Sequence, residues 1–197
     1  MDKLTSTPGP RIPHRKAGLK GINRFHLGIA IRDASPAELF DSLNDPPVDL
    51  VPTPESNEEG EGRYENAEAF FPRLGPWLGS DMNEVYYKAG ITAQLGLSAH
   101  LLKVGFPDRW CAQRIGHRVA HSLAYANASG LNHRCLEMAH LAAVLTPYWR
   151  WNSQSIHHYG APKDPGFTVE EVRDLLRDLL AQVRLVTGYV LINGDLA

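Results

Sequence analysis

The sequence predicts a mainly α-helical protein, with an extended, Pro-rich N-terminal arm that holds at most one or two short strands. A helical domain follows over 80–197, with a central αα-hairpin and a C-terminal amphipathic helix. Three observations predict this class. Apolar residues recur every three to four positions in the second half, as one face of a helix requires. Ser, Thr or Asp stands three residues before Glu at several points, a pattern typical of helix starts. Prolines gather in the first 79 residues, where they disfavour long helices.

The composition is that of a globular protein. The 197 residues are 43% hydrophobic and 21% charged, which is enough apolar chain to bury a core. No apolar run reaches the roughly 20 residues that a membrane span needs, so we expect no membrane insertion. The first residues lack the apolar stretch of a secretory signal, and two cysteines do not make a disulfide framework. We therefore expect a cytoplasmic protein.

The segment over 1–79 combines several kinds of structure. Residues 1–24 are rich in Pro, Gly, Lys and Arg and lack a helical period, which predicts an extended arm. Residues 25–32 alternate large apolar residues with small or polar ones, which predicts a short strand. Ser35 caps a helix that we expect to run to about Leu43. The Pro- and Glu-rich stretch over 44–76 then predicts a solvated acidic linker.

Glycines divide the start of the helical domain. Asp81 opens a capping pattern that predicts a helix to about Ala89. Gly90, Gly96 and Gly105 then predict breaks between short helical pieces.

A helical hairpin comes next. Residues 109–128 and 133–146 both have helical patterns, and the Ser-Gly-Leu-Asn sequence between them predicts a tight turn. Pro147 predicts the end of the second helix.

The last helix has the clearest pattern. It begins with a capping pattern at Thr168 and ends at Gly188. Core packing is the role that we expect for its apolar face, and a seam for a partner helix is the alternative. The residues of this face are Val172, Leu175, Leu176, Leu179, Leu180, Val183 and Val186.

Charge is distributed unevenly along the chain. Residues 1–33 carry seven Lys/Arg and two Asp, whereas residues 44–72 carry eight acids and only Arg63. Residues 84–150 carry seven Lys/Arg, three acids and five histidines. This pattern favours electrostatic contacts, either within the chain or with an anionic partner.

Residues 91–118 resemble the helix-turn-helix of small DNA-binding proteins. In the sequence ITAQLGLSAHLLKV, Gly96 stands where the turn would lie, and Ser98 stands where it would cap the second helix. The resemblance implies that this second helix enters the major groove while basic side chains contact phosphates. The implied DNA contacts are Ser98, His100, Lys103, Arg109, Arg114 and Arg118. Short helices in an all-α core are the alternative.

Histidines and one glutamate recur at helical spacing on the two hairpin helices. His117 and His121 are four residues apart on the first helix, and His133, Glu137 and His140 share a face of the second. Helical bundles build zinc or iron sites from such ligands, and the ingredients are similar to those of hemerythrin-like and di-iron bundles. The candidate zinc or iron ligands are His117, His121, Glu137 and His140. Surface and helix-terminal histidines without a metal are the alternative.

An aromatic segment, Tyr148-Trp149-Arg150-Trp151-Asn152, follows the predicted helix end. Such a segment can seat the last helix on the hairpin as an apolar plug, which is the role that we favour. A binding hot spot or a stacking platform for nucleic acid is the alternative.

Binding is the function that the sequence predicts first, because no convincing catalytic constellation is found in it. We expect a non-enzymatic helical protein that engages a macromolecular partner: another protein, a second copy, or DNA through residues 91–118. The first alternative is a metal-dependent helical enzyme or sensor that uses the hairpin site, and only this alternative needs zinc or iron as a cofactor. The second alternative is a structural subunit of a larger assembly.

Overall fold

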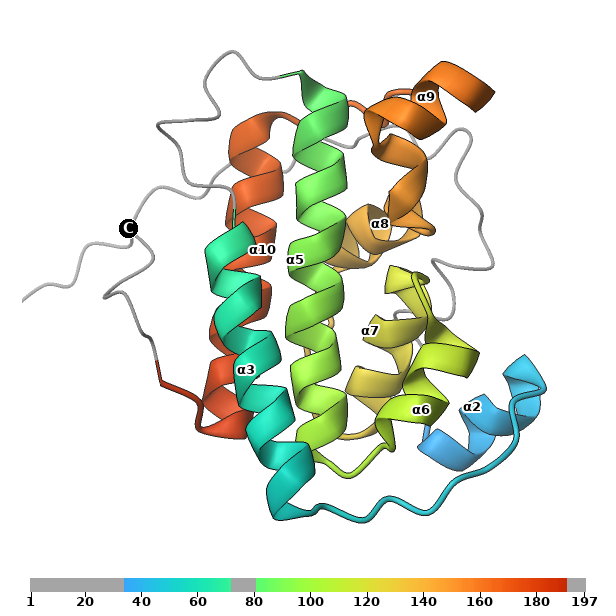
Figure 1. The fold of residues 1–197 in the computed structure, drawn as a ribbon, viewed down its shortest axis with the longest axis vertical. Helices are drawn as coiled ribbons and strands as arrows, with labels where there is room; N and C mark the ends of the chain where they lie inside the picture. Colours follow the sequence, from blue (N-terminus) through green and yellow to red (C-terminus); the bar gives the residue numbers. More distant parts are fainter. Residues whose placement is uncertain (1–33, 72–80, 191–197) are drawn as a thin grey trace, which may run out of the picture.

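The long helix α5, Met82–Lys103, lies at the centre of the fold in the computed structural model, which describes residues 34–71 and 81–190. Helices α3 (Pro54–Phe70) and α10 (Val169–Thr187) run beside it on one side (Figure 1). Helix α7 (Val119–Ala128) and the 3-10 helix η2 (Tyr148–Trp151) contact α5 on its other side. α5 therefore connects the two halves of the molecule.

The remaining helices are short. They are α2 (Pro36–Leu43), α6 (Asp108–Trp110), the π-helix η1 (Cys111–Ile115), α8 (Leu136–Val144) and α9 (Ser153–Tyr159). The mainly α class is confirmed, because the described residues hold helices and no strand. The arm expected over 1–24 and the strand expected over 25–32 lie outside the described residues.

Two predicted helix starts are confirmed with both hydrogen bonds of a capping box. At α2, Ser35 Oγ accepts from the Glu38 N–H at 3.3 Å, and Glu38 Oε2 accepts from the Ser35 N–H at 2.7 Å. Thr168 and Glu171 form the same pair at the start of α10, at 3.2 and 2.8 Å. These bonds satisfy N–H groups that have no partner within the helix. α10 ends at Gly188 as predicted, in a left-handed conformation that glycine adopts easily.

The acidic segment after residue 53 is a helix, and the expectation of a solvated loop there is wrong. Thr53 caps α3, and Pro54 occupies its first position, where the missing N–H costs nothing. No proline stands between Pro54 and Pro72. Tyr64 and Ala67 are fully buried on this helix, so packing against α5 stabilises it. The prolines therefore lie outside the helix or at its first position.

α5 runs without interruption through Gly90 and Gly96, so the breaks expected at these glycines are wrong. The glycines instead allow close packing. A Cβ atom at Gly90 would lie 2.1 Å from the Tyr148 Cβ, and one at Gly96 would lie 2.7 Å from the Leu180 Cδ2. The break expected at Gly105 is confirmed, because this residue follows the helix with a φ of 98°.

α7 and α8 pack against each other as the predicted hairpin, but its first helix begins later than expected. The segment over 109–118 contains the end of α6, the π-helix η1 and a turn, and α7 starts only at Val119. Gly116 interrupts the helix with a φ of 55° and a ψ of −126°. The second helix, α8, also begins later than expected, at Leu136, and ends at Val144, three residues before Pro147.

One hydrophobic core joins the elements. The predicted core role of the last helix is confirmed for five of its seven apolar residues: Val172, Leu176, Leu179, Leu180 and Val183. Leu175 is half-buried, and Val186 is 39% exposed and does not belong to the core. Phe40, Phe106, Trp110 and Tyr125 pack together on the other side of the molecule, with ring centroids 5.2 to 6.4 Å apart. Within the described part of the chain, no helix is both long enough and apolar enough to cross a membrane.

Candidate functional site

The helix-turn-helix prediction for residues 91–118 is wrong, because there is no turn at Gly96. As a result, the supposed recognition helix is the buried second half of α5. Ser98 is 5% exposed and accepts a hydrogen bond from Arg63, and His100 is 2% exposed. The His100 Nε2 lies 3.3 Å from the Ser129 Oγ, inside the protein. These two side chains are not accessible to DNA in this structure.

The basic residues of the same prediction lie in different surroundings. Lys103 donates to the Asn57 side chain and lies 5.5 Å from the centre of the Tyr189 ring. Arg118 is half-buried, and its Nε donates to the Ile115 carbonyl at 3.1 Å. The remaining two are exposed on α6 and η1; they are Arg109 and Arg114.

The predicted metal ligands do not come together. Among the described residues, no three His, Cys, Asp or Glu side chains form a group that could hold a metal ion, so the structure does not support the predicted zinc or iron site. His117 precedes α7 and therefore does not share a helix face with the buried His121. The other two ligands point to separate neighbours: Glu137 accepts from the Cys135 thiol at 3.3 Å, and the His140 ring lies 5.0 Å from that of Phe167.

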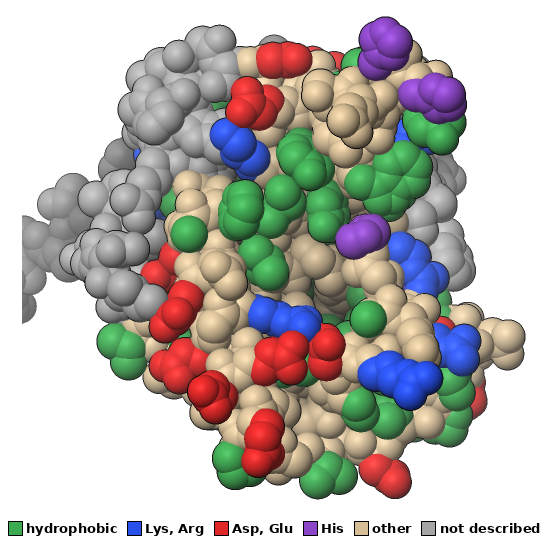
Figure 2. All heavy atoms as spheres, viewed as in Figure 1, with side chains coloured by type: hydrophobic (Ala, Val, Ile, Leu, Met, Phe, Trp, Pro, Cys, Tyr) green, Lys and Arg blue, Asp and Glu red, His purple; other side chains and the backbone are tan. Residues whose placement is uncertain are grey.

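Charged side chains divide the molecule into two sides. Figure 2 shows Asp and Glu gathered toward the lower left, where α3 lies, and Lys, Arg and His mainly toward the right, where α6 to α9 lie. Helix α3 carries six Glu and only Arg63. By contrast, residues 109–163 carry six Lys/Arg, six His and a single acid, Glu137. We call the surface formed by residues 109–163 the basic side.

The cations of the two sides also differ in their partners. On α3, Arg63 pairs with Glu59 and with Asp108, each at 2.6 Å, and on α10 Arg177 pairs with Asp174 at 2.9 Å. On the basic side, Arg109, Arg114 and Arg150 form no ion pair with any described residue. No ion pair within the described part of the protein therefore neutralises these three arginines.

The two tryptophans of the segment over 148–152 have opposite roles. Trp151 is 3% exposed, its ring lies 4.5 Å from that of Tyr86, and its Nε1 donates to the Val144 carbonyl at 3.2 Å. Trp151 is thus buried as a plug, but it packs against α5 and the end of α8, whereas we expected a plug between the last helix and the hairpin. Trp149, two residues earlier in η2, is 37% exposed and belongs to the surface.

Trp149 lies in a surface group that we call the aromatic cluster: Trp149, Arg150, His158 and Tyr159. The Trp149 and Tyr159 rings are 6.3 Å apart, and the His158 ring is 4.4 Å from that of Tyr159. The Arg150 guanidinium lies 5.8 Å from the Trp149 ring and 5.2 Å from the Tyr159 ring. Its Nε is buried and has no hydrogen-bond partner among the described residues.

Local structure places these side chains at one end of the molecule. η2 carries Trp149 and Arg150, and Asn152 then caps α9 by accepting from the Ser155 N–H at 2.7 Å. α9 ends with Tyr159, because Gly160 leaves the helix with a φ of 78°. Reasoning from the sequence missed the contribution of α9, although a His-His-Tyr run shortly after the aromatic segment was a visible signal.

Other ring contacts involve the residue next to the aromatic cluster in the sequence. Tyr148, which directly precedes Trp149, lies 5.1 Å from the His117 ring and 6.1 Å from the Tyr87 ring. His117 is exposed and comes three residues after Arg114. The basic side therefore combines exposed aromatic rings with arginines that form no ion pair among the described residues.

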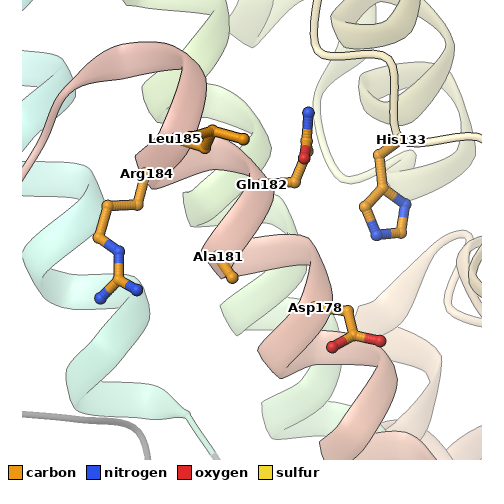
Figure 3. Close-up of a pocket in the computed structure, with 6 residues that line it drawn as sticks. All are labelled: His133, Asp178, Ala181, Gln182, Arg184 and Leu185. Carbon is orange, nitrogen blue, oxygen red and sulfur yellow. The ribbon is translucent and has the colours of Figure 1, made fainter. Parts of the chain in front are cut away.

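A separate cavity of about 460 Å³ lies between α10 and the connection from α7 to α8. Figure 3 shows the His133 ring and the Asp178 carboxylate directed toward the space between the two segments, whereas Arg184 points away, toward α3. Gln182 at its wall donates to the Leu131 carbonyl at 2.7 Å. Burial lowers the pKa of His133, and the charge of Asp178 opposes this effect. The cavity offers an imidazole and a carboxylate to a small polar ligand, but its six lining residues include no Ser, Thr or Cys nucleophile.

Comparisons of the chain with models of protein families, with curated proteins and with solved structures give no match. The function must therefore be inferred from the chemistry of the surface itself.

Proposed function

We propose that the protein is a non-enzymatic binding protein that engages nucleic acid through its basic side. The observation that carries this proposal is that Arg109, Arg114 and Arg150 form no ion pair with a described carboxylate, in a stretch of 55 residues with one acid. The binding role is the one that the sequence predicts first. The contact surface, however, is different from the helix-turn-helix of that prediction, since only Arg109, Arg114 and Arg118 of its six residues belong to the basic side.

The physical reason is the response of arginine to phosphate. The guanidinium stays charged at any physiological pH and donates two parallel hydrogen bonds to phosphate oxygens. An arginine that is already paired with a carboxylate must lose that pair before it binds phosphate, whereas Arg109 and Arg114 have no such pair among the described residues. Each phosphate contact also releases condensed counterions, so the affinity rises as salt is lowered.

The acidic side contributes to orientation. Because α3 carries six Glu and one Arg, a polyanion is repelled from that part of the surface. The two sides therefore direct a nucleic acid toward α6, η1 and α9. The overall charge of −2 does not oppose this, because the charges that face the ligand decide the local potential.

A binding titration tests the proposal. We expect the full-length protein to bind a fluorescently labelled oligothymidylate of about 20 nucleotides at low salt, measured by fluorescence anisotropy. The double variant Arg109→Ala/Arg114→Ala should bind at least about 10-fold more weakly, because two phosphate contacts are lost.

Arg177→Ala is the matched control, because this arginine lies on α10 and pairs with Asp174. It should leave the affinity unchanged. Absence of binding by the native protein, or equal binding by the double variant and the native protein, would contradict the proposal.

A further inference from the structure

We propose that Trp149, Arg150 and Tyr159 form a base-stacking site that makes the protein prefer unpaired nucleotides over duplex. The inference rests on the proposed function, since it names the part of nucleic acid that the basic side recognises. In this proposal the exposed aromatic cluster binds bases, whereas the buried Trp151 of the same segment packs against α5.

The exposure of the two rings is the first observation. Trp149 is 37% exposed and Tyr159 is 59% exposed, so part of each aromatic side chain faces solvent. Their rings meet at an interplanar angle of 63°, so neither ring covers the other face to face. Ring surface therefore remains available to a planar ligand.

Arg150 provides the second observation. Its guanidinium lies against both rings, where cation–π attraction holds it. No described carboxylate pairs with it, and its buried Nε has no described hydrogen-bond partner. Because it has no carboxylate partner, the Arg150 guanidinium can pair with a phosphate next to a base that stacks on Trp149 or Tyr159.

The position of the cluster is the third observation. Tyr148 directly precedes Trp149 and its ring lies 5.1 Å from that of His117, which follows Arg114 of η1 by three residues. A single strand that stacks a base on Trp149 can therefore place neighbouring phosphates near the arginines of η1 and α6. Proteins that bind single strands combine these two features, a basic track and aromatic side chains.

Stacking selects for single strands for a simple reason. In a duplex, each base is already stacked on its neighbours, and its faces are closed to protein side chains. An unpaired base exposes its faces at little cost. Phosphate contacts alone would not distinguish the two forms in this way, so the strand preference separates stacking from charge.

Variants of Trp149 test the site. Trp149→Ala should lower the affinity for oligothymidylate about 5- to 100-fold, as expected for the loss of one stacked base. Trp149→Phe should restore most of the affinity, because phenylalanine keeps an aromatic face. Binding to a duplex of equal length should change little in either variant. The dependence on salt should also stay the same, because no phosphate contact is removed.

Phe70→Ala is the matched control. Phe70 is 43% exposed, a fraction similar to that of Trp149, but it lies on α3, outside the basic side. Its removal should not alter oligothymidylate binding. If Trp149→Ala lowers the midpoint of thermal unfolding, Tyr159→Ala replaces it in the titration. Tyr159 is more exposed, so its removal should disturb the fold less.

The outcomes separate the two proposals. If Arg109→Ala/Arg114→Ala weakens binding while Trp149→Ala and Tyr159→Ala do not, the stacking site is overturned and the proposed function stands. Equal affinity of the native protein for single strand and duplex also overturns the stacking site. If the native protein binds neither form at low salt, both proposals fail.

Discussion

His100 shows how a single buried side chain makes stability depend on pH. It is 2% exposed, and burial lowers its pKa to about 4, although nearby hydrogen bonds oppose the shift. In the unfolded chain an imidazole takes up a proton near pH 6.5. The folded protein therefore binds fewer protons than the unfolded chain between these two values, and its stability falls as pH falls.

We expect His100 to cost the folded state on the order of 3 kcal/mol when the pH falls from 7 to 4. Urea unfolding at several pH values measures this loss, and His100→Gln should make the free energy of unfolding less dependent on pH. The lowered pKa values of His133 and His140 also make the folded state less stable as pH falls. The contribution of His100 is therefore the difference in pH dependence between the variant and the native protein. An identical pH dependence in both would contradict this account of His100.

Tyr125 offers a second test at this scale. Its hydroxyl donates to Asp45 Oδ2 at 2.8 Å, which ties the segment after α2 to α7. Tyr125→Phe should lower the free energy of unfolding by about 1 kcal/mol, because a partly buried hydrogen bond is lost. Tyr159→Phe is the control, since this exposed hydroxyl lies at the surface. Equal stability of the two variants would show that the Asp45 bond contributes nothing.

At the scale of elements, the glycines of two helices have different tasks. Gly90 of α5 meets Tyr148, whereas an added Cβ at Gly62 of α3 would have no neighbour within 4 Å. Gly90→Ala should destabilise the protein by about 1 to 3 kcal/mol through overpacking. Gly62→Ala should stabilise it by about 0.5 to 1 kcal/mol, because alanine is the better helix former. Chemical denaturation measures both, and a stabilising Gly90→Ala would contradict the observed packing of η2 on α5.

The same glycines explain where prediction from the sequence fails. A glycine that breaks a helix and a glycine that lets two elements approach look alike in one sequence. Gly105 and Gly116 interrupt helices. Gly90 and Gly96 instead allow close contact with Tyr148 and Leu180, which lie far away in the chain. Capping patterns are local, and for this reason the starts at Ser35 and Thr168 were predictable.

The candidate site was predictable only in part. The excess of Lys and Arg over acids can be counted in the sequence, and so can the aromatic segment over 148–152. What the sequence does not contain is the separation of Trp151, which is buried, from Trp149, which is exposed. The contact of α9 with η2 and the absence of an ion pair at Arg150 among the described residues also depend on the tertiary fold.

At the scale of the whole molecule, the division of charge is the feature with the most consequences. The net charge of −2 hides an acidic helix, α3, and a basic side with one acid in 55 residues. The acids of α3 neutralise nearby cations such as Arg63, and α5 separates them from most of the basic side. A molecule with this arrangement binds a polyanion in one orientation and with a strong dependence on salt.

The salt dependence of oligothymidylate affinity is the measurement that tests the central claim most directly. If Arg109, Arg114 and Arg150 each contact a phosphate, a plot of log affinity against log salt should have a slope of about −2. Arg109→Ala/Arg114→Ala should reduce the magnitude of this slope by about 1.4, and Arg177→Ala should not change it. An affinity that does not depend on salt, or a slope that is equal in the double variant and the native protein, would contradict the claim that the basic side binds nucleic acid.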